Sequence, residues 1–333
     1  MSRWRFTKGL HQTGNGVYAY LQPDGGWGWS NAGLIESRGQ TLLVDTLMDL
    51  SVTREMLEEM KRKVPQSAKI DKLVNTHANP DHFAGNELVL GAEIIAAKPA
   101  AVEIAATNFA AIADALENKT GSGGDSGEFL YETMGRYFDL RGITLTPPTR
   151  TFERELELLI GDKIVKLIDL GPAHTKSDTI VYVPGDKTIF TGDLLFNECT
   201  PVMWAGPVLN WISACDYMLS LDVETIVPGH GPIADPAGVR NLKSYFIYVR
   251  DETRKRYDAG IAWEEAARDL SLGEFAKWGD AERIVGNVYS LYKEFGATIV
   301  LKSEREVMGA MLRWRKLRAE RHAADDHTNC AHG

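Results

Sequence analysis

Residues 74–86 read VNTHANPDHFAGN, and two histidines and an aspartate lie within the six positions from His77 to His82. The stretch follows the strand-like run KLV at 72–74, and the turns after strands are where a rigid scaffold usually carries its reactive groups. Imidazole and carboxylate side chains gathered in one turn are typical of a metal site. A two-metal site would have a further imidazole where this chain has Asn79. The alternative is a polar turn that merely resembles a metal site.

The first third of the chain alternates strand-like and helical patterns. Apolar strand-like segments occur at 41–46, 72–77 and 93–97. Between them, Ser51 is expected to cap one helix, and Pro99 is expected to open an alanine-rich helix. Alternation of this kind predicts a layered α/β fold.

The rest of the chain divides into segments of different character. Residues 119–150 begin with a glycine- and serine-rich loop and are interpreted as an insertion. Strand patterns then dominate to about residue 231, and helical patterns follow. We therefore expect a catalytic domain at 1–235, a helical C-terminal extension at 236–320 and a polar, disordered tail at 321–333.

Five separate strand ends each carry an aspartate or a histidine. They are the segments LLVDT with Asp45, HANPDH from His77 to His82, GPAHT with His174, TGD with Asp193 and PGHG with His230. If the strands pair into sheets, these groups can converge at one edge. A lone histidine in a turn is usually a surface residue, but five such groups at five strand ends are hard to produce by chance. We therefore interpret them as one metal site.

The order LLVDT, HxHxDH, GPAHT, TGD and PGHG resembles the signature of the metallo-β-lactamase superfamily, over roughly residues 14–235. The resemblance implies an α/β fold of the αββα type, with two mixed sheets face to face, helices outside and metals at one sheet edge. It also implies two ligand sets. These are His77, Asn79 and His174 for one metal; Asp81, His82 and His230 for the other; and Asp193 as the bridge. Asp45 would support a ligating imidazole from outside.

Asn79 is the position at which this chain departs from the family pattern. An amide oxygen is a weak neutral ligand for zinc, whereas imidazole is a strong one, so the first site should be empty or only partly occupied. The sequence therefore predicts one tightly bound Zn²⁺. Its ligands would be Asp81, His82, Asp193 and His230. One zinc suffices for hydrolysis, because it lowers the pKa of a bound water to about 7.

The underused ligands of the first site are candidate catalytic groups. His77 or His174 would transfer protons, since an unperturbed imidazole has a pKa near about 6.5. Asn79 would hydrogen-bond the attacking water or the substrate. Asp81, as a ligand of the retained zinc, would be required for turnover.

Four tryptophans flank the expected groove in the sequence. Trp27 and Trp29 lie in PDGGWGWSNAGL, and Trp204 and Trp211 lie in NECTPVMWAGPVLNW. Each could instead be a core residue. Because they occur before and after the metal motifs, they favour a flat, apolar or aromatic small-molecule substrate.

These two loops, together with Asn79, resemble a branch of the superfamily that includes chlorothalonil hydrolytic dehalogenase and polyketide cyclase/thioesterases. The resemblance implies attack of zinc-activated hydroxide on an electrophilic carbon. Hydrolytic dehalogenation of an activated chlorinated aromatic is the first interpretation, and polyketide cyclisation or ester or thioester hydrolysis is the second. A non-catalytic or iron-loaded metal-binding protein is the alternative of another class, although no flavodoxin-like pattern follows to support a redox role.

Composition limits the partners and the compartment. The formal net charge of −9 gives no reason to expect nucleic acid or an anionic membrane surface as a partner. No run approaches the roughly 20 apolar residues of a membrane span, and no secretory signal is recognisable. Three scattered cysteines do not suggest a disulfide framework. We expect a cytoplasmic protein, and the apolar faces of the helical extension suggest a homodimer.

Overall fold

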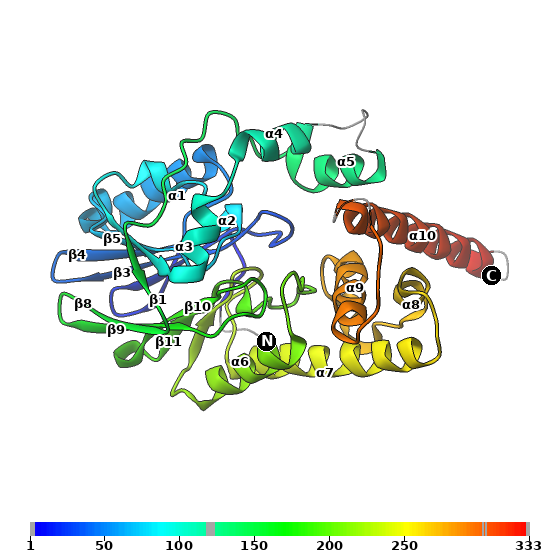
Figure 1. Ribbon diagram of the computed structural model, residues 1–333. Helices are drawn as coiled ribbons and strands as arrows, with labels where there is room; N and C mark the ends of the chain where they lie inside the picture. The colour runs from blue at the N-terminus through cyan, green and yellow to red at the C-terminus, as the bar shows by residue number, and fades with distance from the viewer. Residues whose placement is uncertain (1–3, 118–123, 302, 304, 331–333) are drawn as a thin grey trace.

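The computed structural model describes residues 4–117, 124–301, 303 and 305–330, with side chains as far as residue 320. Two β-sheets stack face to face (Figure 1). The first sheet holds, in spatial order, β1 (Gly9–Gly14), β2 (Val17–Leu21), β3 (Ala32–Ser37), β4 (Gln40–Val44), β5 (Lys72–Val74), β6 (Glu93–Ala97) and β7 (Arg150–Phe152). The second holds β12 (Thr225–Val227), β11 (Thr188–Phe190), β10 (Thr179–Val183), β9 (Lys163–Asp169) and β8 (Glu155–Ile160).

Parallel pairing within each sheet decides where the turns emerge. β4 pairs in parallel with β5, with Val44 opposite Val74. β11 pairs in parallel with β12, with Phe190 opposite Val227. The carboxyl ends of a parallel pair lie at the same edge of the sheet. The turns that follow these four strands are therefore neighbours although they lie far apart in the sequence.

The space between the sheets is filled by aliphatic side chains. Val17, Ile35 and Val74 of the first sheet belong to one buried cluster with Val181 and Val227 of the second. Every residue of β10 is buried. Since this strand lies inside the second sheet, its apolar side chains stabilise both layers of the sandwich.

Helices cover the outer faces of both sheets, which gives an αββα sandwich and confirms the α/β fold (Figure 1). The helices are α1 (Leu50–Lys63), α2 (Pro80–Phe83), α3 (Lys98–Ala105), α4 (Phe109–Glu117), α5 (Gly124–Leu130), α6 (Val208–Ser220), α7 (Pro236–Asp258), α8 (Trp263–Asp269), α9 (Ile284–Glu294) and α10 (Arg305–Cys330). A π-helical turn, Tyr131–Gly135, follows α5. None of these helices is both long and apolar enough to cross a bilayer.

Two helix boundaries differ from the sequence-based expectation. Asp49, not Ser51, caps α1, because its Oδ1 accepts the backbone N–H groups of Ser51 and Val52 at 2.8 and 2.9 Å. A carboxylate at this position also interacts favourably with the helix dipole. The alanine-rich helix expected after Pro99 is two helices, α3 and α4. It breaks before Asn108, whose Oδ1 accepts Ala111 N–H and starts the second helix.

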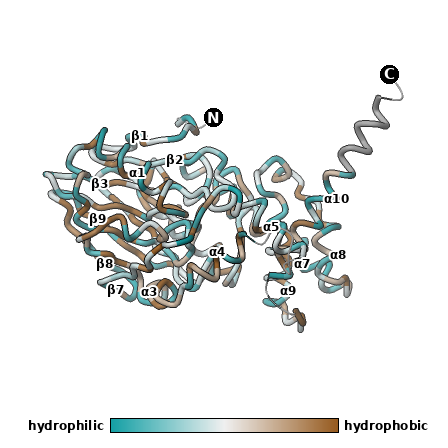
Figure 2. Tube along the Cα trace, turned by 90° about the horizontal axis from the view of Figure 1, so that it is seen from above, coloured by the Kyte–Doolittle hydropathy of each residue, from teal (hydrophilic) through white to brown (hydrophobic). Residues whose placement is uncertain are grey.

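The helical extension shares a hydrophobic core with the sandwich. Leu242 and Phe246 of α7 are buried with Trp211 of α6 against the outer face of the second sheet. The same cluster continues to Val288 of α9 and Met311 of α10. In Figure 2 the hydrophobic strands gather at one end of the molecule, and α7, α8 and α9 lie at the other.

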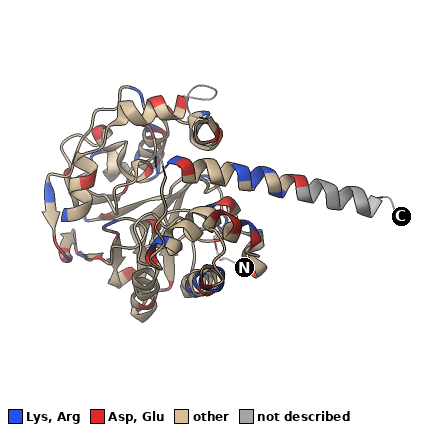
Figure 3. Cartoon of the chain, turned by 45° about the vertical axis from the view of Figure 1, so that its right-hand side comes forward, with Lys and Arg blue, Asp and Glu red and all other residues tan. Residues whose placement is uncertain are grey.

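Two basic side chains of α10 form ion pairs with acidic side chains of α5. Arg313 pairs with Asp125 of α5 at 2.8 Å, and Lys316 pairs with Glu128 of α5 at 2.8 Å. Figure 3 shows basic positions, in blue, along the described part of α10. The two ion pairs hold α5 and α10 together. The disorder expected for 321–333 stays a prediction: α10 is helical to Cys330, and residues 331–333 lie outside the described residues.

Candidate metal centre and substrate cavity

Asp45 organises the turn that follows β5. Its φ of +61° is uncommon for a residue other than glycine, but aspartate tolerates it. One carboxylate oxygen accepts Thr76 N–H at 2.7 Å. The other accepts the Thr76 hydroxyl at 2.8 Å and His82 Nδ1–H at 2.9 Å. Asp45 therefore links the end of β4 to the turn after β5 and fixes the His82 ring, as expected of an outer partner.

Hydrogen bonds and close backbone packing also order the turns that follow the other strands. Asp178 orders the loop of His174 by accepting the backbone N–H groups of Ala173 and Thr175. Asp193 lies on a tight turn after β11, and Gly229 of the turn after β12 packs directly against it. A Cβ atom at position 229 would overlap the Asp193 carboxylate. Glycine is thus required for the turn after β12 to approach Asp193.

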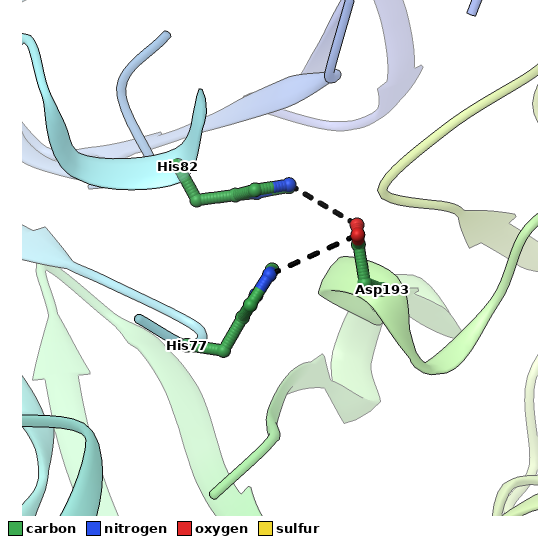
Figure 4. A group of neighbouring side chains, drawn as sticks. All are labelled: His77, His82 and Asp193. Atoms are coloured by element: carbon green, nitrogen blue, oxygen red, sulfur yellow. Dashed lines mark ion pairs between the residues drawn. The ribbon is translucent and has the colours of Figure 1, made fainter. Parts of the chain in front are cut away.

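Four imidazoles converge on the Asp193 carboxylate. His82 Nε2 lies 3.1 Å from Oδ1, while the Nε2 atoms of His174, His230 and His77 lie 3.2, 3.5 and 3.8 Å from Oδ2. Figure 4 shows His77 and His82 directed at Asp193 from the turn after β5. All five residues are buried.

Asp81 lies on the other side of the same cluster. Its Oδ2 is 3.2 Å from His230 Nε2 and 3.8 Å from His82 Nε2. Three of the four residues predicted as the main site, Asp81, His82 and His230, form one group of nearby ligand atoms, whereas the fourth, Asp193, is grouped with His77 and His82. Two overlapping groups have ligand atoms that all lie within 4.8 Å of one another. They are His77, His82 and Asp193, and Asp81, His82 and His230.

Each of the four imidazoles has its Nδ1 engaged outside the cluster. The partners are Thr76 Oγ1 for His77 at 3.0 Å, Asp45 Oδ2 for His82 at 2.9 Å, Val202 O for His174 at 2.7 Å and Gly25 O for His230 at 3.1 Å. Because Nδ1 donates in every case, Nε2 is the atom that each ring directs into the cluster. This is the arrangement that orients histidine ligands around a metal.

The donor set fits a divalent cation. His77 Nε2, His82 Nε2 and Asp193 Oδ1 are buried and have no hydrogen-bond partner. Buried polar atoms without partners are rare and costly, and each of these points at the others. Imidazole nitrogens and carboxylate oxygens suit zinc and its neighbours among the first-row metals. A bound cation would satisfy all three atoms at once.

The charges within the cluster are strongly coupled. Burial alone would raise the pKa of both carboxyls. The histidines outweigh it, holding the pKa of Asp81 at about 2 and that of Asp193 well below its usual range. Burial alone would lower the pKa of His82 and His230, but the carboxylates raise it, to about 9 for His230. For His77, burial and then His82 hold the pKa well below its usual range. Without a metal, protons on His82 and His230 therefore balance the carboxylate charge that a cation would otherwise balance.

Asn79 is bonded to His174 rather than directed at the cluster as a ligand. Its Nδ2 lies 2.8 Å from His174 Nε2. Since His174 donates through Nδ1 to Val202 O, Nε2 is an acceptor and the Asn79 amide must donate to it. The bond occupies the lone pair that His174 would offer a metal. An empty or partly occupied first ligand set stays a prediction, and this bond is consistent with it.

A cavity of about 300 Å³ opens onto the cluster. Asn79, Asp81, His174, Asp193 and His230 lie at its polar end. Its walls are mostly apolar and come from the N-terminal loop, α4, α5, the π-helical turn and α10. They include Trp27, Met48, Leu116, Leu130, Met134 and Met308.

The four tryptophans have different environments. Trp27 and Trp204 line the cavity, with ring centroids 6.3 Å apart. Trp29 packs on Phe138 outside the described cavity lining, at 4.6 Å between ring centroids. Trp211 is fully buried on the inner face of α6 and donates to Leu194 O. The substrate contact expected of Trp211 is therefore wrong, because its helix faces the sheet.

Sequence reasoning missed the contribution of the helical extension. Arg283 lines the cavity, and Glu282 accepts a hydrogen bond from Trp27 Nε1 at 3.0 Å. Arg315 of α10 pairs with Glu282 at 2.5 Å. No sequence motif points to these residues as part of the site. The feature that could have drawn attention to them is the charged run Asp-Ala-Glu-Arg, which directly precedes the apolar stretch IVGNVY.

A family model described as the Metallo-beta-lactamase superfamily matches residues 25–230. Among solved structures, a metallo-beta-lactamase from Pontibacter korlensis superposes with a TM-score of 0.53 at 19% identity, covering 72% of this chain and 98% of that one. The sec-alkylsulfatase Pisa1 from Pseudomonas sp. superposes with a TM-score of 0.65 at 16% identity, covering 88% of this chain and 51% of its own. The alkylsulfatase match thus extends into the helical extension.

A curated relative is similar over a shorter stretch. The 2,4-dinitroanisole O-demethylase subunit alpha of Nocardioides sp. (strain JS1661) is 32% identical over 90 residues. These residues make up 25% of this chain and 26% of that relative. The family model covers well over half of the chain, and the two solved structures share its fold. The chain belongs to the metallo-β-lactamase superfamily.

Proposed function

We propose that this protein is a zinc-dependent hydrolase that attacks an electrophilic carbon of a flat, apolar substrate, and that the substrate is an activated chlorinated aromatic. The observation that carries the proposal is the cavity of about 300 Å³, which joins an apolar chamber to the buried carboxylate and imidazole cluster. A chamber of this kind suits a ligand with few polar groups. Superfamily membership supports metal-dependent hydrolysis in general.

Asp81, His82, Asp193 and His230 would hold the zinc. When bound, the metal supplies Lewis acidity and lowers the pKa of a bound water to about 7. Trp27 and Trp204 line the cavity in which an aromatic ring would bind, and most of the cavity wall is apolar. Chloride would leave from the ring carbon that gains the oxygen.

His174 and Asn79 are the better candidates for contact with the water or the substrate. Both line the cavity, whereas His77 is not among the residues that line it. His174 holds Val202 O through Nδ1, so proton transfer would take place at Nε2, once Nε2 exchanges its hydrogen bond with the Asn79 amide for one with the water. We therefore assign the shuttle role to His174 rather than His77.

Polyketide cyclisation or thioester hydrolysis is the second candidate, and one further observation favours it. A second cavity of about 630 Å³ shares Asn79, Trp204 and Met308 with the first. Lys176 and Lys293 line this outer chamber. A substrate longer than one ring could extend from one chamber into the other.

The test uses protein stripped of metal and then reloaded with zinc. Chloride release from a chlorinated aromatic nitrile and hydrolysis of an acyl thioester are measured side by side. We expect zinc-dependent chloride release that Asp81→Ala abolishes. Thioester hydrolysis alone would select the second candidate, and metal binding without either activity would favour a non-catalytic protein. The cytoplasmic location and the homodimer stay predictions.

A further inference from the structure

The outer chamber, of about 630 Å³, adjoins the cavity that opens onto the metal cluster. Four residues line both spaces, and they are Asn79, Trp204, Arg305 and Met308. Asn79 is also bonded to His174 of the cluster. A ligand whose reacting end lies at the cluster can therefore extend past these residues into the outer chamber.

The lining of the outer chamber carries more positive than negative charge. Its charged residues are Glu103, Lys176, Lys293 and Arg305. Lys176 Nζ lies 2.6 Å from a carboxylate oxygen of Glu103, so these two charges cancel. Within the part of the chain that the structure describes, the side chains of Lys293 and Arg305 form no ion pair. Two positive charges therefore remain in the lining.

Both of these cations are available to a ligand in the chamber. Lys293 lies in the last turn of α9, and its ammonium is 5.2 Å from the ring centroid of Tyr289, which lines the same chamber. Arg305 begins α10 and lines both spaces. The two side chains are exposed, so each can turn its charged end toward a ligand. Both belong to the helical extension, whereas the metal centre belongs to the sandwich.

The local charge indicates which ligand the chamber suits. The whole chain has a formal net charge of −9, so two unbalanced cations in one chamber are a local exception. At physiological salt, exposed charges act over about 8–10 Å, so distant acidic residues are largely screened from the chamber. A concave site with partly apolar walls concentrates the field of its own charges. Lysine and arginine side chains both bind carboxylate and phosphate oxygens.

We propose that the outer chamber binds an anionic oxygen group, a carboxylate or a phosphate, at the end of the substrate remote from the reacting carbon. This inference rests on the proposed function and adds a charged end to its substrate. The apolar body would occupy the cavity beside Trp27 and Trp204, and the anionic group would contact Lys293 and Arg305. Such a contact attracts and orients the substrate without taking part in the reaction.

Binding of matched probes to the zinc-loaded full chain tests the proposal without turnover. Dissociation constants of phenylhexanoate, phenylhexyl phosphate and the neutral phenylhexanamide are measured by ligand-observed NMR at low and high salt. At low salt we expect the carboxylate, the phosphate or both to bind about fivefold more tightly than the amide, as for two exposed ion pairs. The anion that shows the preference identifies the group. At about 0.5 M salt the preference should fall to within about twofold.

Two double variants locate the anion. Lys293→Gln with Arg305→Gln should bring the preference to within about twofold and leave binding of the amide unchanged. Arg240→Gln with Lys277→Gln is the matched control, because it removes the same charge from exposed residues that line neither space, and it should keep the preference. Lys293→Gln alone should lose part of the preference, and it decides the matter if the double variant does not fold.

Three results would overturn the proposal. Equal binding of all three probes to the wild-type protein would show that the chamber does not select anions. A preference that survives in Lys293→Gln with Arg305→Gln would place the anion elsewhere, for example on the zinc. Loss of the preference in the control variant as well would show that only long-range attraction is at work.

The outcome is distinguishable from failure of the proposed function. If the wild-type protein releases chloride but shows no preference for the anionic probes, this inference fails and the hydrolase proposal stands. If it shows the preference but hydrolyses neither test substrate, the anion site stands and the proposed reaction fails.

Discussion

The metal centre and the cavity wall next to it are built from different parts of the chain. Each imidazole and carboxylate of the centre follows a strand of the sandwich, and parallel pairing brings these strand ends to one edge. The wall instead takes side chains from the N-terminal loop, α4, α5 and α10, together with Arg283 ahead of α9. Backbone register therefore positions the centre, whereas packing between distant segments positions the wall.

The two regions are also held by different interactions. In the centre, hydrogen bonds from outside fix every imidazole. In the wall, Trp27 lies against the Arg283 guanidinium and donates one hydrogen bond to Glu282. Glu282 in turn forms an ion pair with Arg315 of α10. We expect variants of the centre to change metal affinity, and variants of the wall to change substrate binding alone.

The largest effect is expected from Asp193→Ala. This change removes the carboxylate on which four imidazoles converge, so the loss should exceed the roughly 10–100-fold typical of outer partners. Zinc affinity is measured by competition with a chromophoric chelator, with the exposed Asp222→Ala as the control. Near wild-type affinity in Asp193→Ala would show that the cluster is not the metal site.

Asp45→Asn should weaken zinc binding by about 10–100-fold. Asparagine tolerates the positive φ of position 45, so the backbone is kept. The variant loses the charge that supports His82 Nδ1–H. The same chelator competition measures the change, and a change smaller than twofold would argue against Asp45 as the outer partner.

Zinc affinity should rise about tenfold per pH unit for each proton displaced, between pH 7 and about pH 9. The pKa of His230 is raised to about 9, so in the metal-free protein its imidazole is protonated at pH 7 and must lose a proton to bind a cation. The same raised pKa stabilises the metal-free fold below about pH 6.5, and this contribution is lost as the pH rises through about 9. Calorimetry in buffers of different ionisation enthalpy counts the protons released. Release of none would contradict the coupling.

Glu282→Gln should have the smallest effect and should leave zinc affinity unchanged. The amide keeps the volume but loses the charge that pairs with Arg315, and it weakens the bond from Trp27. We expect KM for an aromatic substrate to rise about threefold to tenfold, the effect of one hydrogen bond. The control is Glu274→Gln, which changes an exposed glutamate of the same helical extension. It is a better match than Gln22→Glu, which lies at a buried site away from the cavity. Loss of zinc from Glu282→Gln would contradict the expectation that variants of the cavity wall change substrate binding but not metal affinity.

The same contrast explains what the sequence could predict. Asp45, Asp193 and His230 were recognisable because each directly follows an apolar strand, and parallel strands end at one edge. The αββα layers followed from the same alternation. The bond between Asn79 and His174 could not be predicted, because it depends on the tautomer that Val202 O imposes.

The wall was beyond sequence reasoning for a physical reason. The contact of Trp27 with Arg283 joins residues more than 250 positions apart, and no strand pairing implies it. Trp211 looked equivalent to Trp204 in the sequence. The periodicity of α6 turns Trp211 toward the second sheet, while Trp204 precedes the helix and stays at the cavity.

Counting the metal is the most direct test of the central claim. The wild-type protein and Asn79→His are loaded with excess zinc, dialysed and analysed by mass spectrometry of the metal per chain. The account predicts one zinc in the wild-type protein and two in Asn79→His, because an imidazole at position 79 completes the first ligand set and frees His174 Nε2. Retention of no zinc by the wild-type protein, or of two, would contradict it.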